Sequence, residues 1–170
     1  LHMDGLMDSF DAIFSRRDTE TRLKILDDVH ASSFAVIGCV LILMAKTLLF
    51  AEVFSQELNI NFLFSVPVYS RLGMAVLLNN IKFAKNNGLA VILGNSRNSR
   101  GNFFFAILFL ILVFINNSLI IPVIFIFSLI IWIRICLKNF GGITGDLIGA
   151  FLELSENSIL IGLVVNVKCI

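Results

Sequence analysis

Two acidic motifs with neighbouring glycines stand near opposite ends of this chain. In the first, the run from His2 to Asp11, the carboxylates of Asp4, Asp8 and Asp11 recur at i, i+4 and i+7. If the run is a helix, these side chains share one face and repel one another. A bound Mg²⁺ or Mn²⁺ would remove that repulsion, because hard oxygen ligands suit both ions. The spacing therefore predicts a divalent-metal site, with a solvated acidic helix end as the alternative.

The second motif runs from Gly141 to Asp146 and contains three glycines. Glycine permits tight backbone turns, and exposed amides at a helix N-terminus can cradle an anion. We therefore expect Gly141, Gly142 and Gly145 to contact phosphate and Asp146 to begin a helix and bind metal. Glu153 lies two turns further along the same face, and acids within an apolar segment are functional by default. A membrane enzyme acting on an activated phosphate ester is the chemistry that both motifs favour.

Several basic residues are candidates for phosphate contact, because the arginine fork matches phosphate oxygens. Arg16 and Arg17 follow the first motif, with a membrane-surface anchor as the alternative role. Arg71 stands in an apolar segment bent by Pro67. Lys46 lies in the middle of another apolar segment and needs an acidic partner.

The elements that must position these residues are membrane helices. The chain is 58% hydrophobic and 15% charged, whereas soluble domains carry about 25% charged residues. A net charge of +1 indicates no bulk attraction to nucleic acid. We predict an all-α, polytopic membrane helix bundle of about five spans, with residues 1–170 as a single integral membrane domain. The apolar segments are 33–53, 62–80, 103–115, 119–137 and 147–167.

Basic residues orient these segments, because loops rich in Lys and Arg stay in the cytoplasm. The loop 82–101 is basic and is expected inside, whereas residues 54–61 lack a basic residue and are expected outside. Residues 1–31, with an amphipathic helix at 19–30 capped by Asp18, and residues 138–146 then also fall inside. Both acidic motifs are therefore predicted at the same cytoplasmic face.

The motifs resemble the signatures of the cobalamin synthase family, the adenosylcobinamide-GDP ribazoletransferases. Residues 2–12 and 14–18 resemble its first signature, and Arg22 to Asp28 its next block. Ser70-Arg71-Leu72 is similar to a later Ser-Arg pair. The run 141–146, continued by Gly149, Glu153 and Glu156, resembles its closing signature. The family has further membrane helices before the first signature, so the chain is expected to lack its N-terminal helices.

This resemblance implies a reaction. The cobinamide-phosphate moiety of adenosylcobinamide-GDP is transferred to α-ribazole or its 5′-phosphate, and GMP is released. It implies a magnesium-dependent enzyme of the bacterial inner membrane with a cytoplasmic active site. Asp4, Asp8 and Asp146 are then expected to hold Mg²⁺, and Asp11 or Glu153 to act as the catalytic base. The basic residues Arg16, Arg17 and Arg71 are expected to contact the substrate phosphates.

Two other functions compete with this interpretation. A membrane phosphotransferase of the CDP-alcohol type would also use a metal held by spaced acids, but the distal glycine-aspartate spacing expected there is absent. A small membrane transporter would use Lys46, Glu153 and Glu156 as a pathway. The chain has no internal repeat, and a transporter leaves both glycine-acid motifs unexplained.

Overall fold

The computed structural model describes residues 2–55, 60–94, 98–116 and 118–168, and helices dominate throughout them. The prediction of an all-α protein is confirmed, because every named element in these ranges is a helix. The elements are α1 (His2–Phe14), α2 (Thr19–Ile25), α3 (Ser33–Ser55), α4 (Ile60–Asn80), α5 (Leu89–Gly94), α6 (Ser99–Asn116), α7 (Ile120–Phe140) and α8 (Gly145–Lys168).

Each predicted apolar segment lies in one of the long helices α3, α4, α6, α7 and α8. By length and composition, α3, α7 and the Gly145–Asn166 part of α8 can cross a membrane, and α6 contains a shorter apolar stretch, Arg100–Phe114. The expectation of about five spans thus corresponds to three full candidate spans and one shorter apolar helix in the described part of the chain. These apolar helices are those of a membrane protein.

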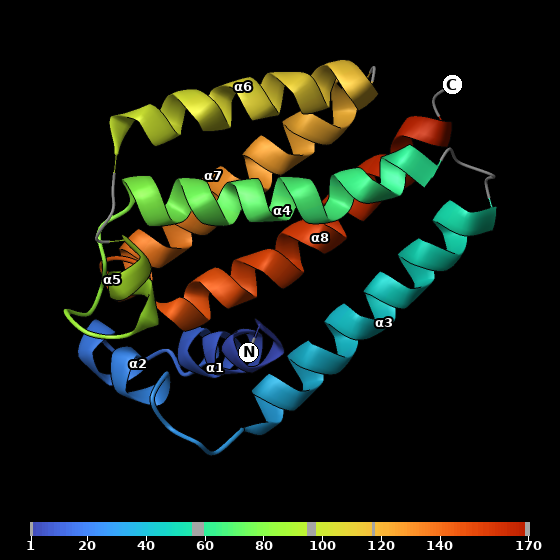
Figure 1. Cartoon of the computed structure of the whole chain (residues 1–170). Helices are drawn as coiled ribbons and strands as arrows, with labels where there is room; N and C mark the ends of the chain where they lie inside the picture. The colour runs from blue at the N-terminus through green and yellow to red at the C-terminus, as the bar shows by residue number, and fades with distance from the viewer. Residues whose placement is uncertain (1, 56–59, 95–97, 117, 169–170) are drawn as a thin grey trace.

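Helix α8 is the centre of the bundle. It contacts α1, α3, α4 and α7, and in Figure 1 it lies between α4 and α3. In the most apolar 18-residue stretch of α8, 61% of the residues are buried, whereas in the corresponding stretch of α3 only 6% are buried. The indole Nε1 of Trp132 on α7 donates to the backbone oxygen of Leu147 on α8 at 3.0 Å. Helix α8 is therefore packed by protein, whereas α3 presents its apolar side chains outward, as a lipid-facing helix does.

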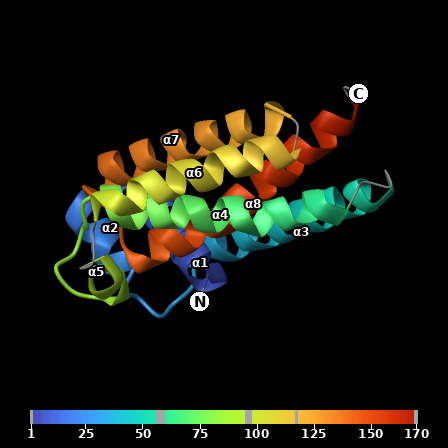
Figure 2. The same cartoon turned by 45° about the horizontal axis from the view of Figure 1, so that its top comes forward.

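The short helices α1, α2 and α5 gather at one end of the bundle, beside the start of α8 (Figures 1 and 2). Backbone pairing of the segment before α5 with the connection between α7 and α8 strengthens this end. The amide of Ala84 donates to the oxygen of Ile143, and the amide of Ile143 donates to the oxygen of Lys82, both at 2.9 Å. A Cβ on Gly142 would lie 2.6 Å from the Lys82 oxygen, so this pairing requires glycine.

Helix α2 begins as predicted but ends early. Its N-cap is Asp18, whose carboxylate accepts from the amide of Thr21 at 3.4 Å. The predicted helix over 19–30 is wrong beyond Ile25, and Val29 is 92% exposed rather than on a packed face. The carboxylate of Asp28 accepts from the amide of His30 at 3.0 Å. Such local side-chain bonds compete with helix continuation.

Candidate functional site

The two acidic motifs meet where α1 packs against the start of α8. A Cβ on Gly5 would lie 2.6 Å from the backbone oxygen of Asp146 and 2.7 Å from its Cα. The hydroxyl of the buried Ser9 donates to the backbone oxygen of Gly5 at 2.6 Å, within α1. Both motifs were predicted at the same cytoplasmic face. The structure confirms that they lie together, since their backbones are in contact, and the side of the membrane that they face stays a prediction.

A cavity of about 580 Å³ opens at this junction. Its walls come from α1, α4, α5, α8, the turn after α2 and the segments that lead into α5 and α8. Its polar lining residues are His2, Asp4, Asp27, Lys85, Asn87, Thr144 and Asp146, and its apolar lining includes Met74, Leu78, Ala90, Val91, Ile148 and Leu152. A mostly apolar lining with a few polar and charged side chains, at this volume, is typical of a small-molecule site.

Asp8, which was predicted to bind metal, is not among the described residues that line the cavity, but it is close enough to other carboxylates for their charges to act on it. Partial burial raises the pKa of Asp8 to about 6, and the negative charges of Asp4, Asp146 and Asp11 add to the effect. The ionised form of Asp8 is therefore disfavoured by its acidic neighbours as well as by lost solvent. A cation placed among these side chains would relieve that cost.

The carboxylates that line the cavity could hold a hard cation if a bound phosphate supplied further oxygen ligands. Among the residues that the structure describes, no three Asp, Glu, His or Cys side chains are gathered as a ready-made metal site. Mg²⁺ usually needs only one or two carboxylates, with water and substrate phosphates completing its shell. Asp4 and Asp146 face the same cavity from two different helices and meet that requirement.

The start of α8 forms one wall of the cavity. Thr144 caps the helix, because its hydroxyl accepts from the amide of Leu147 at 3.3 Å. Gly145 lines the cavity and has open space where a side chain would stand. Gly141 and Gly142 do not line it: Gly141 ends α7 with a φ of 72°, and Gly142 lets the Lys82–Ala84 backbone approach. Of the three glycines predicted to contact phosphate, the structure brings Gly145 to the site.

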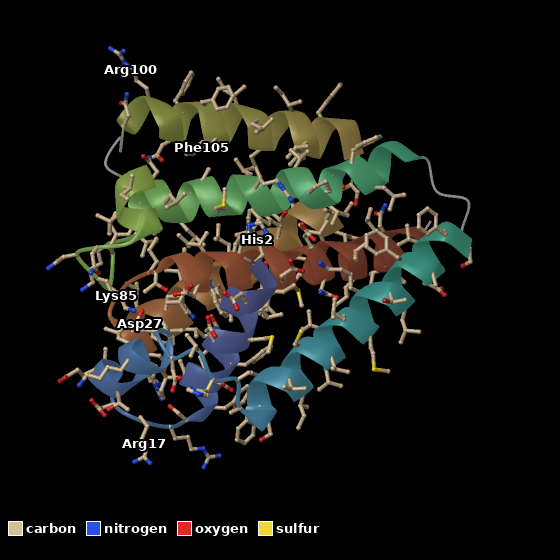
Figure 3. The ribbon with its side chains drawn as sticks, turned by 60° about the horizontal axis from the view of Figure 1, so that its bottom comes forward. His2, Arg17, Asp27, Lys85, Arg100 and Phe105 are labelled. Carbon is tan, nitrogen blue, oxygen red and sulfur yellow. The ribbon has the colours of Figure 1, made fainter. Side chains whose placement is uncertain are left out.

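Asp11 lies outside the cavity lining and caps a neighbouring helix. Its carboxylate accepts from the amides of Ser32 at 2.8 Å and Ala35 at 2.9 Å, and from the Ser32 hydroxyl. The predicted phosphate contacts Arg16 and Arg17 also lie outside the lining and are exposed. In Figure 3, Arg17 points away from His2. These residues are thus near the first motif in sequence but are not gathered at the cavity.

Arg71 and Glu153 belong to an ion network that joins α3, α4 and α8. The Lys46 ammonium contacts Glu153 at 2.6 Å and Glu156 at 2.9 Å. Glu156 in turn accepts from Arg71 at 2.9 Å. The expectation that Lys46 needs an acidic partner is confirmed. Neither Arg71 nor Glu153 is among the described residues lining the cavity.

Lys85 and Asp27 reach the cavity, although the motif analysis did not select them as site residues. Their side chains form an ion pair with Nζ and Oδ1 2.6 Å apart, and they lie side by side in Figure 3. The predicted membrane orientation could have pointed to them, because it placed the basic loop 82–101 and the segment containing Asp27 at the same face as the two motifs.

Comparison with known proteins gives the family. The family model described as cobalamin-5-phosphate synthase matches residues 1–164. The chain belongs to the cobalamin-5-phosphate synthase family. The resemblance carried by its two acidic motifs is thereby confirmed at the level of the family.

Curated relatives of this cobalamin-5-phosphate synthase family member carry the name adenosylcobinamide-GDP ribazoletransferase. The one from Geobacillus thermodenitrificans (strain NG80-2) is 33% identical, over 92% of this chain and 63% of the relative. The one from Halalkalibacterium halodurans is 34% identical, over 92% of this chain and 64% of the relative. The one from Clostridium botulinum (strain Loch Maree / Type A3) is 32% identical, over 95% of this chain and 66% of the relative. The chain thus spans slightly under two thirds of their length, and no solved structure matches it.

Proposed function

We propose that this protein is an adenosylcobinamide-GDP ribazoletransferase. It transfers the cobinamide-phosphate moiety of adenosylcobinamide-GDP to α-ribazole, or to its 5′-phosphate, and releases GMP. Family membership and the names of the relatives support this activity over a CDP-alcohol phosphotransferase or a transporter. The observation that carries the proposal is the cavity into which Asp4 and Asp146 project from opposite ends of the chain.

The chemistry requires positioning and charge neutralisation rather than a covalent intermediate. A ribazole hydroxyl oxygen forms a bond to the phosphorus on the cobinamide side of the diphosphate. The bond from that phosphorus to the oxygen bridging to GMP breaks, and GMP leaves with its electron pair. Asp4 and Asp146 would hold Mg²⁺, with Asp8 supporting them through its charge. The ion would neutralise negative charge on the diphosphate oxygens.

The hydroxyl proton needs an acceptor at the cavity. Asp11 and Glu153, the acceptors predicted from the resemblance, are held by the start of α3 and by Lys46 respectively. We therefore favour His2, which lines the cavity and whose imidazole nitrogen can accept a proton from a hydroxyl within hydrogen-bond reach. Asp4 and Asp146 then remain as cation ligands.

The membrane setting is supported by the apolar helices α3, α7 and α8. We propose that the bilayer is the bacterial inner membrane and that the cavity opens to the cytoplasm. The basic residues Lys82, Lys85 and Arg100 near this end of the bundle support that orientation. Both substrates would then be drawn from the cytoplasm.

Genetic complementation tests the activity. The complete reading frame would be expressed in a bacterial strain that lacks its ribazoletransferase and is supplied with cobinamide and a lower base. We expect cobalamin to be formed, and formation to be lost with Asp4→Ala or Asp146→Ala but kept with Glu20→Gln, an exposed acid on α2. Membrane-inserted wild-type protein that gives no cobalamin would overturn the proposed function.

A further inference from the structure

The cavity has a shortage of positive charge for its proposed substrate. Its described lining contains Asp4, Asp27 and Asp146, whereas Lys85 is the only Lys or Arg among the same residues. Arg16, Arg17 and Arg71 lie elsewhere. A diphosphate ester entering this cavity would bring two negative charges to three carboxylates, more than one Mg²⁺ ion would balance, so a cationic side chain within reach would stabilise the bound substrate.

Lys85 is held at the cavity by the backbone around it. The pairing of Ala84 with Ile143 fixes the residue immediately before Lys85 against the segment that leads into α8. The Lys85 side chain is 21% exposed, and its ammonium is 2.6 Å from the Asp27 carboxylate, which is 71% exposed. The charges of Lys85 and Asp27 also act on Asp146. Lys85 is therefore paired with a solvent-facing acid and lies within electrostatic range of the proposed metal ligand Asp146.

The partner of Lys85 is readily replaced. An ion pair with an exposed carboxylate contributes little net free energy, since water screens it. The diphosphate of the proposed substrate carries two negative charges against one on Asp27, and lysine binds phosphate as a mobile point charge without a fixed fork geometry. A phosphate oxygen in the cavity would therefore compete effectively with Asp27 for the ammonium.

We infer that Lys85 is the substrate-phosphate-binding residue of this site, and that it exchanges the Asp27 carboxylate for a diphosphate oxygen when substrate binds. This inference rests on the proposed function and adds to it a residue that neither motif contains. Asp27 is the residue that holds Lys85 in place while the cavity is free of substrate. The rival interpretation is that the pair only ties the turn after α2 to the segment before α5.

The two interpretations predict opposite results for the two halves of the pair. We would measure GMP release by the full-length protein in liposomes, varying adenosylcobinamide-GDP, for the wild type, Lys85→Met, Lys85→Arg and Asp27→Asn. Lys85→Met is expected to raise KM for this substrate by about tenfold to a hundredfold, the value of a hydrogen bond to a charged group. Lys85→Arg is expected to stay within about threefold of the wild type, and Asp27→Asn to lower KM by up to about fivefold. The KM for ribazole should not change.

Lys82→Met is the matched control, because Lys82 lies in the same segment but its exposed side chain does not line the cavity. An unchanged KM in Lys85→Met, or an Asp27→Asn variant whose KM rises like that of Lys85→Met, would overturn the inference and leave the proposed function intact. If Lys85→Met does not fold, the change in KM caused by Asp27→Asn decides between the two interpretations, because a lower KM supports the inference and a higher KM overturns it. A wild type that releases no GMP would overturn the proposed function instead. The role of Lys85 would then be tested separately by measuring the binding of GDP to the wild type and to the Lys85→Arg, Lys85→Met and Asp27→Asn variants.

Discussion

Gly5 on α1 lies so close to Asp146 on α8 that a Cβ on Gly5 would come within 2.6 Å of the Asp146 backbone oxygen. The obstacle would be backbone, which cannot rotate away as a flexible side chain can. The first acidic motif can therefore rest on the second only because residue 5 lacks a side chain. The contact also fixes where Asp4 stands relative to Asp146, and hence the geometry of the proposed metal site.

Gly5→Ala is expected to separate the two motifs. Overpacking of this kind costs about 1–3 kcal/mol, which is partly offset by the roughly 1 kcal/mol that alanine gains over glycine inside a helix. We therefore expect a small loss of thermal stability but a large loss of GMP release, at least about tenfold. Gly101→Ala is the control, since the nearest atom to a Cβ there is 3.7 Å away. A Gly5→Ala variant with wild-type turnover would show that the close contact does not set the site geometry.

The pKa of Asp8 gives a stability prediction with a definite sign. Burial and neighbouring carboxylates raise this pKa from 3.8 to about 6 in the folded protein. The folded state then binds the proton more tightly than the unfolded state, so stability falls as pH rises between these values. The ionised carboxylate costs stability above about pH 6 and costs nothing below about pH 4.

Asp8→Asn removes that cost. Because Asp8 is only partly buried, screening by solvent limits the gain in unfolding free energy to about 1 kcal/mol or less at pH about 7. Thermal unfolding in detergent with a chelator present, followed from pH about 7 down to about 5, should show the variant's advantage shrinking. An advantage that grows as the pH falls would contradict the assigned cause.

Asp11 offers a test between capping and catalysis. Asp11→Ala is expected to lower stability by about 1–2 kcal/mol, because the start of α3 loses its acceptor. Asp11→Asn keeps one of the two acceptor oxygens, so it should lose less stability than Asp11→Ala and retain turnover to within about threefold. An Asp11→Asn protein that is stable yet inactive would restore the catalytic role that the resemblance suggests for this residue.

Lys46 neutralises two glutamates inside the bundle. Its side chain is 17% exposed, and those of Glu153 and Glu156 are 14% and 19% exposed. Lys46→Met leaves Glu153 unpaired and should cost about 3–5 kcal/mol.

The double variant Lys46→Met with Glu153→Gln should recover part of that loss, because Arg71 still pairs with Glu156. The measurement is thermal unfolding in detergent. A Lys46→Met protein as stable as the wild type would mean that water or lipid already satisfies these charges.

Hydrophobicity and local chemistry made part of this molecule predictable. The apolar segments lie in helices because twenty or so apolar residues have few other stable structures. The cap at Asp18 follows from its side chain and its place before a helical pattern. The distribution of basic residues predicted that both motifs share one face of the membrane, and the resemblance added that Asp4 and Asp146 share a metal site.

The other contacts of the site depend on the path of the loops and on the rotation of each helix about its axis, and the spacing of residues in the sequence specifies neither. Asp11 shares a helical face with Asp4 and Asp8, but the return of the chain at Ser32 directs its carboxylate into the start of α3. Arg71 was predicted to contact phosphate, but the rotation of α4 points it toward Glu156. The pairing of Lys85 with Asp27 needs two loops far apart in sequence to meet. None of these contacts leaves a signature in residue order.

The most direct test of the account is the transfer reaction itself with purified full-length protein in liposomes. Adenosylcobinamide-GDP and α-ribazole would be supplied with Mg²⁺ or with a chelator, and GMP and the corrinoid product would be measured together. We predict equal amounts of both products from the wild type, none with the chelator, and at least a roughly hundredfold loss of turnover in Asp4→Asn and Asp146→Asn, with Glu20→Gln unchanged. Turnover that survives either substitution or the removal of the metal would contradict the claim that the two acidic motifs form one cation and phosphate site.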